Sequence, residues 1–442
     1  MITQGLLVLV VGMATSPRRA PDVQSPLSHA AIGEVARSLR EGGAARTLAV
    51  VGGGLAGMSV AFHATQLDSS VGVAVFDTAL PGEGGASAAA AGLLHPLTTR
   101  GGLIWRGVES FDSAARLVQR TQAHADEARA PGPPQPFYFE HGVLRVARSE
   151  AQAKIYEDSA AKARWRCADS PRAAKHFSWV DGDQARALIG KAAAPADCAG
   201  GVWCVRGLCI DAPSYLRALW TATAEAAASA RWCVVEVRAL AELCVQFDAV
   251  VVTVGAASAN VPGLEKLPLS LVRGQTLCYR MPVEACPRVG VLGGVYLVPL
   301  EDAPGGRRVI GGATYEPLGM GAEVEVEADA DAPSAALADL RAQLGLLWPP
   351  SEGAQLEGGR LHGSGIRAVP PRTHLGSVPL TGRVPGTENA WFVTGLGGRG
   401  LLYHAELGRT VAAAALTNDH GALLSETTAT RSSPLSGSTT VE

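Results

Sequence analysis

Three glycines and an aspartate near the start of the chain have the types and spacing of a site for phosphate and ribose groups. Gly52, Gly54 and Gly57 form the pattern G-x-G-x-x-G, and Asp77 ends the second apolar run after them. In this pattern the first glycine allows a tight turn, the second lets a pyrophosphate approach the backbone, and the third lets a helix pack closely on a strand. A carboxylate at the place of Asp77 accepts hydrogen bonds from ribose hydroxyls. These residues therefore predict that the chain binds a dinucleotide.

The segments around the motif have the patterns of the elements that such a loop needs. Residues 47–51 form a short apolar run rich in Val, which predicts a buried parallel strand. Residues 58–66 are typical of a helix, and residues 71–76 predict a second strand. A helix that follows the loop turns free N–H groups and the positive end of its dipole toward the phosphates. The motif alone does not distinguish NAD from FAD.

Two further segments are rich in small residues. Residues 81–92 contain Ala86, Ser87 and Gly92, and taken alone they also fit an alanine-rich linker. Near the end of the chain, residues 390–394 predict a strand, residues 395–400 a glycine loop and residues 401–416 a helix. Loops of the nucleotide-binding type at both ends of one chain are more typical of a flavoprotein than of an NAD-dependent dehydrogenase.

These loops resemble those of the D-amino-acid oxidase superfamily, which includes glycine oxidase and sarcosine oxidase, and the resemblance extends over about residues 48–416. It implies that Ser87 hydrogen-bonds the pyrophosphate of FAD and that the late helix stabilises the reduced flavin with its positive dipole end. Val235, on a strand expected over residues 232–237, would contact the adenine through its backbone. The implied FAD contacts are Gly52, Gly54, Leu55, Ala56, Gly57, Asp77, Ala86, Ser87, Gly92, Leu93, Val235, Thr253, Gly255, Gly395, Gly397, Gly398, Arg399, Gly400 and Leu401.

The resemblance also implies two residues for the substrate. Residues 365–371 are similar to a segment in which the family's arginine clamps the substrate carboxylate, and that arginine corresponds to Arg367. Tyr296 falls where family members place a tyrosine beside it. A guanidinium offers two parallel donors that match a carboxylate. An arginine in a surface salt bridge and a half-buried strand tyrosine remain the alternatives. His95 is expected either to polarise the site or to pack as a structural histidine.

Segments in the middle of the chain are most similar to one branch of the superfamily. Residues 248–255, 267–275, 294–299 and 309–316 resemble the FAD-oxidase half of the bacterial bifunctional enzyme that modifies the tRNA wobble uridine. That half oxidatively removes a carboxymethyl group from an amine. The bifunctional enzyme carries a methyltransferase domain before the oxidase, whereas only about 45 residues precede the first expected strand here. This difference puts the tRNA substrate in doubt.

Composition restricts the class of protein further. Hydrophobic residues make up 47% of the 442 residues, which predicts a large core, and the formal net charge is only −3. This charge does not support a nucleic-acid partner, although tRNA stays open as a substrate. The eight cysteines lie between Cys167 and Cys286 without a C-x-x-C pair, so we expect reduced thiols and no metal site. Because no cysteine follows Cys286, we expect non-covalent FAD, with attachment through a histidine left open.

The first residues of the chain give weak information about location. The apolar run over residues 5–11 is too short to cross a membrane and lacks the preceding positive charge of a secretory signal. Few acids occur in residues 1–33, which is weakly similar to an organelle transit peptide. We therefore expect no membrane partner and no secretion, and the location stays open between the cytoplasm and an organelle such as a plastid or mitochondrion.

The expected fold is a mixed α/β fold with a Rossmann-like FAD-binding domain and a discontinuous substrate domain built on a mixed sheet. Residues 1–45 are expected to be an N-terminal extension, either a transit segment or disordered. The FAD-binding domain would take residues 46–125, 205–262 and 360–420, the substrate domain residues 126–204 and 263–359, and a disordered tail residues 425–442.

These features predict an FAD-dependent oxidoreductase that oxidises the C–N bond of a carboxylate-bearing amine. The substrate would be an amino or imino acid or a carboxymethylamino group, hydride would pass to the flavin, water would hydrolyse the imine, and oxygen would be the electron acceptor. Two alternatives stay open. An NAD-dependent dehydrogenase leaves the late loop and Arg367 unexplained, and the presence of both Arg367 and Tyr296 argues against a non-catalytic flavin-binding protein that serves in assembly or interaction.

Overall fold

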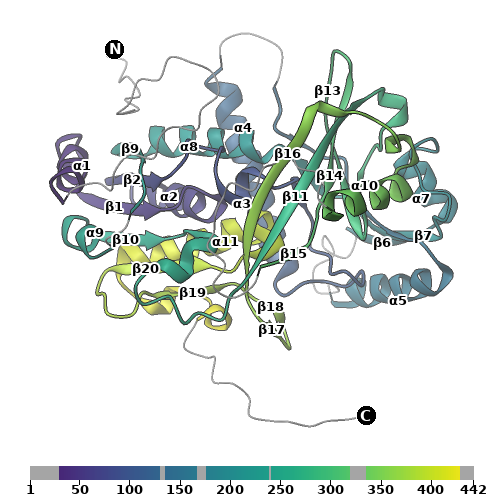
Figure 1. Ribbon diagram of the computed structural model, residues 1–442. Coiled ribbons are helices and arrows are strands. Elements are labelled where there is room, and N and C mark those ends of the chain that lie inside the picture. The colour runs from purple at the N-terminus through teal and green to yellow at the C-terminus, as the bar shows by residue number, and fades with distance from the viewer. Residues whose placement is uncertain (1–28, 130–134, 167–175, 238–239, 319–334, 429–442) are drawn as a thin grey trace.

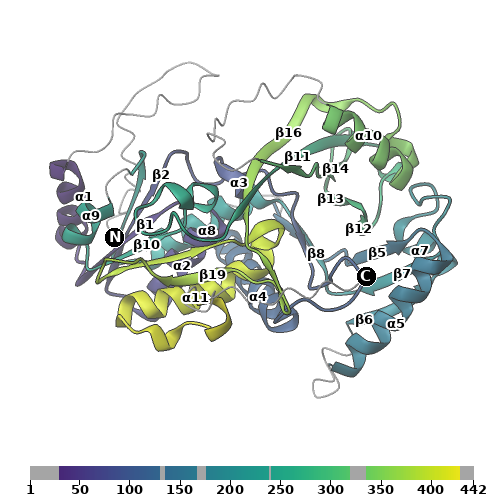
Figure 2. The same cartoon turned by 60° about the horizontal axis from the view of Figure 1, so that its bottom comes forward.

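Two β-sheets stand side by side in the structure, and each is covered by its own helices (Figure 1). The computed structural model describes residues 29–129, 135–166, 176–237, 240–318 and 335–428. Figure 2 shows the same two groups of elements from another side, with β11 (Ser270–Met281) and β16 (Leu356–Val369) between them. The functional site must therefore be sought where these two groups meet.

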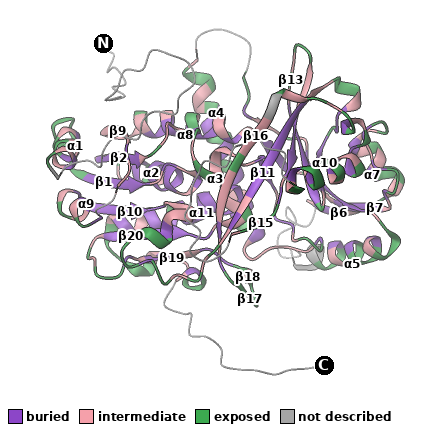
Figure 3. Cartoon of the chain, in the orientation of Figure 1, coloured by how far each residue is buried: buried purple, intermediate pink, exposed green. Residues whose placement is uncertain are grey.

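The first sheet has six strands and the topology of a dinucleotide-binding fold. Five neighbouring strands pair in parallel, and the sixth is an antiparallel edge strand. Because parallel strands are covered on both faces, they read as continuous apolar runs, and the central strands are buried almost throughout (Figure 3). The order across the sheet is β19 (Leu380–Arg383), β20 (Ala390–Thr394), β10 (Ala249–Val252), β1 (Arg46–Val51), β2 (Val71–Asp77) and β9 (Ser229–Val234).

Helices cover both faces of this sheet. Alternate residues of β1 belong to two different hydrophobic clusters, because successive side chains of a strand point to opposite faces. One face packs against α2 (Leu55–Leu67), α8 (Ala212–Ala226) and α11 (Gly400–Thr417), and α4 (Gly107–Glu127) packs on α8 and α11 in the same hydrophobic cluster. The other face packs against α1 (His29–Glu41) and α9 (Leu240–Gln246).

Helix α1 differs from our prediction of an extension over residues 1–45. Its buried residues Ile32, Ala36 and Leu39 recur at helical spacing and pack on the first sheet. These three apolar residues form only a short stripe, and the residues before them have no helical pattern. For this reason the sequence did not predict helix α1. Residues 1–28 lie outside the described residues.

The second sheet is mixed and has nine strands. Its helix-covered face packs against α10 (Ala335–Leu347) and α7 (Gly182–Ile189), and α5 (Glu150–Arg166) covers β6 and β7 near one end. The order is β15 (Glu316–Pro317), β11, β14 (Gly306–Gly312), β13 (Val295–Ala303), β12 (Gly290–Gly293), β5 (Val143–Ala147), β7 (Gly200–Cys204) and β6 (Phe177–Asp181), with β16 paired to β11.

Short elements complete the fold. A three-stranded sheet lies between the two large ones, and several helical turns connect other elements. These elements are α3 (Gly85–Ala88), β3 (Leu93–Leu94), β4 (Tyr138–Phe139), β8 (Leu208–Ile210), β17 (Arg372–Thr373), β18 (Gly376–Ser377), η1 (Gly255–Asn260), η2 (Val283–Ala285), η3 (Pro349–Ser351), η4 (Gly397–Arg399), η5 (His420–Ala422) and η6 (Ser425–Thr427).

The mixed α/β fold class and the Rossmann-like first sheet are confirmed. The domain limits stay a prediction, and two segments differ from them. Strand β16 crosses the limit at residue 360 and pairs with β11 of the second sheet. Thr427, which falls in the tail expected to be disordered, is fully buried and hydrogen-bonds Thr381 at 2.7 Å between hydroxyl oxygens. Residues 429–442 lie outside the described part.

Candidate active site

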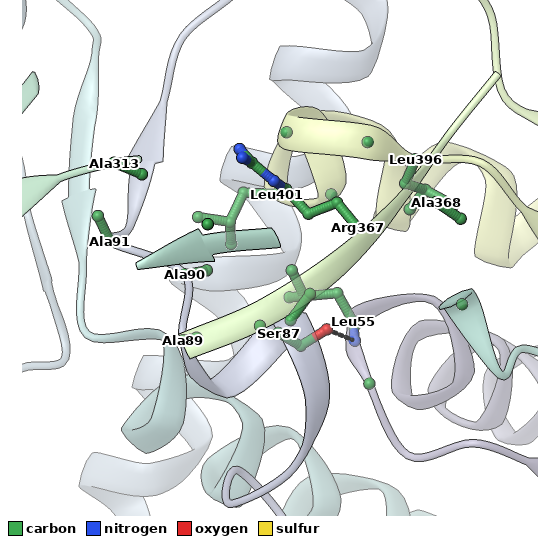
Figure 4. Close-up of a pocket in the computed structure, with 18 of the residues that line it drawn as sticks. Leu55, Ser87, Ala89, Ala90, Ala91, Ala313, Arg367, Ala368, Leu396 and Leu401 are labelled. Atoms are coloured by element: carbon green, nitrogen blue, oxygen red, sulfur yellow. Dashed lines mark hydrogen bonds between the residues drawn. The ribbon is translucent and has the colours of Figure 1, made fainter. Parts of the chain in front are cut away.

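A deep pocket opens where the first sheet, the second sheet and the glycine loops meet. Its empty space is about 1200 Å³ including its open mouth. Three loops form one wall, namely residues 54–56, 86–93 and 395–401, and strands of the second sheet form the facing wall. Figure 4 shows this arrangement, with Leu55 and Ser87 at one side and Leu396 and Leu401 at another. Segments far apart in the sequence thus come together around one space.

The first glycine loop is shaped by contacts that exclude side chains. Gly57 lies against the loop so closely that a Cβ there would sit 1.9 Å from the Gly52 carbonyl oxygen and 2.5 Å from Thr253 Oγ1. Gly52 itself has a φ of +98°, a conformation that favours glycine. The Thr253 hydroxyl, 2.6 Å from the Gly52 carbonyl oxygen, fastens β10 to this loop. Helix α2 therefore starts directly at the pocket wall.

The N-terminus of α2 and Ser87 face the same space. Helix α2 begins at Leu55, without a side-chain cap on Gly54. The Leu55 N–H donates to Ser87 Oγ at 3.1 Å, as the dashed line in Figure 4 shows. A Cβ on Gly54 would lie 2.8 Å from Ser87 Oγ and would fill this cradle. Free N–H groups at a helix start, with a hydroxyl beside them, suit a pyrophosphate.

Asp77 and Val235 lie behind this loop rather than on the pocket lining. The carboxylate of Asp77 accepts from the Gly53 N–H at 2.5 Å and from the Ala79 N–H at 2.9 Å. Burial raises the pKa of Asp77, and the backbone hydrogen bonds oppose this shift. Val235 follows β9, which ends at Val234 and not at residue 237 as expected, and its N–H donates to the Asp77 carbonyl oxygen at 2.6 Å. The contact of Val235 with adenine stays a prediction. Because its N–H is already bonded to Asp77, its carbonyl group is the backbone group left for that contact.

The late glycine loop places a second helix start at the pocket. Strand β20 ends at Thr394, and α11 begins at Gly400 without a side-chain cap hydrogen bond. Its first N–H groups are thus available to an electron-rich group in the pocket, and the helix dipole adds positive potential there. Gly395, Gly397, Gly398, Gly400 and Leu401 all line the pocket. Arg399 is half-buried beside this loop, and burial lowers its pKa.

A face of bare backbone on the second sheet forms the opposite wall. A Cβ on Gly365 of β16 would lie 2.6 Å from the Cα of Ala86, so the loop of residues 86–93 rests directly on this strand. Gly274 of β11 pairs with Gly365, and its missing side chain leaves room for the Arg367 guanidinium. Sequence analysis missed Gly274, Gly363 and Gly365. In β16 the signal is that Gly363 and Gly365 lie two positions apart, because such residues share one face of a strand and mark close approach of another segment.

Arg367 reaches from β16 into the pocket. One Nη donates to the Thr314 carbonyl oxygen at 3.3 Å, and Nε is buried without a hydrogen-bond partner. Among the described residues no acid forms an ion pair with it. Figure 4 shows its guanidinium directed toward the side of the pocket where Leu401 and Ala313 lie. The alternative of a surface salt bridge is therefore wrong, and Arg367 offers free donors to an anion in the pocket.

Tyr296 stands near this guanidinium, and His95 lines the same pocket. Burial raises the pKa of Tyr296 to about 12, while the charge of Arg367 lowers it, so the phenol is neutral and able to donate. Burial, together with the charges of Arg145 and Arg399, lowers the pKa of His95 to about 3. The Leu97 N–H donates to His95 Nδ1 at 3.1 Å, which leaves the proton of the neutral ring on Nε2. Both side chains line the pocket as neutral donors.

Most of the predicted site residues meet at this pocket. Gly52, Gly57, Asp77, Val235 and Arg399 lie beside or behind its lining, where they shape it. Residues that line the pocket but were missed include Ala89, Ala90, Ala91, Gly274, Thr276, Leu292, Ala313, Gly365, Ile366, Ala368, Val393, Thr394 and Leu396. Which of these residues contact a cofactor stays a prediction.

The comparisons with known proteins agree with this geometry. Residues 47–414 match the DAO family, described as FAD dependent oxidoreductase, and the chain therefore belongs to that family. It is a FAD-dependent oxidoreductase enzyme, which removes the alternatives of an NAD-dependent dehydrogenase and of a protein without catalysis. No protein with a curated description matches the chain in sequence.

Solved structures share the fold over most of the chain. Glycine oxidase from Geobacillus kaustophilus has 23% identity and a TM-score of 0.67, over 87% of this chain and 99% of that one. Iminodiacetate oxidase from Chelativorans sp. BNC1 has 19% identity and a TM-score of 0.62, over 84% and 95%. L-amino acid deaminase from Proteus myxofaciens has 12% identity and a TM-score of 0.63, over 93% and 96%. None of these shows a closer relation to the tRNA-modifying enzyme.

The residues of the pocket fit FAD. Two uncapped helix starts, the cradle between Gly54 and Ser87, and the bare sheet face provide places for a pyrophosphate and a flat ring. Within the described ranges, no group of three or more His, Cys, Asp or Glu side chains is placed to hold a metal ion. No helix in those ranges combines the length and apolar character that crossing a membrane would require.

Proposed function

We propose that this enzyme oxidises the C–N bond of an amine that carries a carboxylate, namely an amino or imino acid. The observation that supports this most is the guanidinium of Arg367, which has no acid partner among the described residues and lies with Tyr296 over a glycine face opposite the cofactor loops. Such a fork binds a carboxylate through two parallel hydrogen bonds. It would hold the carbon beside the amine over the place where the ring of FAD fits.

Residues of the chain would then position the substrate while FAD, when bound, supplies the hydride acceptor. Arg367 binds the carboxylate, and the Tyr296 phenol donates a second kind of hydrogen bond to it. His95 stays neutral far below physiological pH and donates from Nε2, so it orients groups without taking up the amine proton. The substrate reacts as the neutral amine and loses hydride to give the protonated imine. Water then hydrolyses this cation to a carbonyl compound and a protonated amine, or ammonium from a primary amine. Dioxygen is proposed as the final acceptor.

A carboxymethylamino group on tRNA is a second candidate substrate. It is favoured by the similarity of residues 248–255, 267–275, 294–299 and 309–316 to the tRNA-modifying oxidase, and the same arginine would receive its carboxylate. The net charge of −3 does not supply the positive surface that binds tRNA strongly.

The test is anaerobic reduction of the purified holoenzyme by a panel of amino acids, imino acids and tRNA that carries the carboxymethylamino group. We expect a small amino or imino acid to bleach the flavin absorption. Replacing Arg367 by Met should lower kcat/KM for that compound at least about 100-fold with FAD content unchanged, because a charged, buried contact is lost. Arg116→Met, at an exposed position on α4, is the matched control and should keep wild-type rates.

The outcomes separate the two substrates. Bleaching by the tRNA alone would replace the amino acid with the nucleoside. Wild-type turnover by Arg367→Met would remove this residue from the carboxylate site.

A further inference from the structure

Arg145 is a buried arginine of β5 that the proposed reaction does not use. It is only 8% exposed, and its Nε is buried without a hydrogen-bond partner. The phenol of Tyr156, on α5, is its hydrogen-bonding neighbour. In the part of the chain that the structure describes, no carboxylate forms an ion pair with it. A guanidinium buried without a counter-charge is unfavourable unless an anion joins it.

The register of the second sheet places Arg145 on the pocket face. Arg145 of β5 pairs with Leu292 of β12, and Leu292 pairs with Tyr296 of β13. Paired residues of neighbouring strands point to the same face, and both Leu292 and Tyr296 line the pocket. Two strand spacings separate the Cα atoms of Arg145 and Tyr296, a distance of about 10 Å. Arg145 therefore flanks the substrate face, beyond Tyr296.

A second arginine and a neutral histidine face Arg145. Arg399 comes from the late glycine loop. Burial is the main cause that lowers the pKa of Arg145; Tyr156 opposes this shift, and the positive charge of Arg399 adds to it. His95 lies near both, since their charges contribute to lowering its pKa. Arg399 has no ion pair with a described acid either. Two positive charges close to each other, with a neutral donor of the pocket lining beside them, attract an anion.

We propose, on the basis of the function proposed above, that Arg145, Arg399 and His95 form a distal anion site that binds a second carboxylate of the substrate. Arg367 and Tyr296 hold the first carboxylate, and the distal anion site lies beyond Tyr296, on the side of β5. The substrate class is then a secondary amine between two carboxylate arms, an imino diacid, rather than a monocarboxylic amino acid. A second carboxylate would supply the counter-charge that the buried Arg145 and the half-buried Arg399 lack among the described residues.

The first experiment needs no substitution. The FAD-loaded enzyme is titrated with oxydiacetate and with methoxyacetate, which share one carboxylate and an ether oxygen in place of the amine but differ in the second carboxylate. Perturbation of the flavin absorption spectrum reports binding. We expect oxydiacetate to bind about 10- to 100-fold more tightly, the range of one charge-assisted contact. Equal or weaker binding of oxydiacetate would overturn the distal anion site.

The second experiment assigns the preference to Arg145. In Arg145→Met the ratio of kcat/KM for iminodiacetate to that for sarcosine should fall about 10- to 100-fold, whereas Arg145→Lys should keep part of it. Arg148→Met, which removes an arginine paired with Asp197 near the end of the same strand, is the control and should keep the wild-type ratio. Equal losses for both substrates would show a structural role and contradict the proposal. FAD content is measured for each variant. If a variant does not fold, the titration of the wild-type enzyme with oxydiacetate and methoxyacetate still tests the distal anion site.

The two proposals fail in different ways. If no amino or imino acid of the panel reduces the flavin while oxydiacetate still binds more tightly, the reaction is wrong and the distal anion site stands. If both compounds reduce it with equal kcat/KM, the reaction stands and the second carboxylate is refuted.

Discussion

Several side chains in and beside the pocket are hydrogen-bond donors that lack an acceptor. Arg145 and Arg367 each have a buried Nε without a hydrogen-bond partner. Such groups are costly to bury unless a ligand completes them. All of these groups are hydrogen-bond donors, and none is an anion. Together they indicate an anionic ligand more directly than any single sequence motif does.

Substitution of Tyr296 by Phe tests the role of the phenol. Removing one hydrogen bond to a charged group should raise KM for the carboxylated substrate about 10-fold or more, with FAD content unchanged. Because the pKa of Tyr296 is about 12, the pH profile between pH 6 and pH 9 should keep its shape in the variant. Steady-state kinetics across that range measures both. A profile whose shape changes would show that the phenol ionises during turnover.

Part of this site was readable from the sequence. Arg367, Tyr296 and the three glycine loops lie within local motifs, so residue types and spacing were enough to predict them. Arg145 was not predictable, because its place beyond Tyr296 depends on β5 pairing with β12, two segments that lie far apart in the chain. No local pattern around Arg145 indicates which strand will be its neighbour.

Close contacts between elements, without side chains between them, set the shape of the cofactor wall. Helix α2 lies against β1 and β10 at Gly57, and helix α11 lies against α2 where a Cβ on Gly408 would meet the Cβ of Ser59 at 2.6 Å. Each contact fixes the direction in which a helix start faces the pocket.

Adding one methyl group at Gly57 tests this arrangement. In Gly57→Ala the new Cβ would meet backbone rather than a flexible side chain, so α2 must move away from the loop. We expect the free energy of unfolding to fall by at least about 2 kcal/mol and FAD affinity to fall with it. Gly345→Ala is the matched control, since it lies in α10 with room for a methyl group and should be neutral or slightly stabilising. Urea unfolding and FAD titration measure both; equal behaviour of the two variants would contradict the close-packing account.

The elements themselves were largely readable from their patterns. The strands expected over residues 47–51 and 71–76 and the helix over 401–416 differ from β1, β2 and α11 by one residue or so at each end. The strand order of the second sheet was not readable. It rests on pairings across long stretches of chain, such as β11 with β16, which local pattern does not encode.

For the molecule as a whole, three histidines whose pKa is lowered in the folded state make stability depend on pH. Burial lowers the pKa of His95 to about 3 and of His63 and His404 to about 4, from the usual 6.5. His404 donates from Nδ1 to the Leu401 carbonyl oxygen and accepts from the Tyr215 hydroxyl through Nε2, which requires the neutral ring. Unfolding below pH 6.5 therefore takes up protons.

Stability should fall as the pH drops from 6.5 toward 4. The unfolded state binds more protons in this window, so the free energy of unfolding decreases with falling pH, by up to about 1.4 kcal/mol per pH unit for each histidine. Urea unfolding at intervals between pH 7.5 and pH 5 measures the slope. His404→Gln should have a shallower slope than the wild type, and a free energy of unfolding that stays constant over this range would refute the account.

The strand order of the first sheet has a consequence for synthesis on the ribosome. Strand β10 pairs with β1 on one side and with β20 on the other, yet β20 starts at Ala390, long after β10 ends at Val252. The nascent chain must therefore hold an apolar strand edge open while the whole of β11 to β16 is translated. Such an edge pairs readily with other chains. The rate of translation through these strands and the presence of chaperones thus become determinants of the yield of folded enzyme.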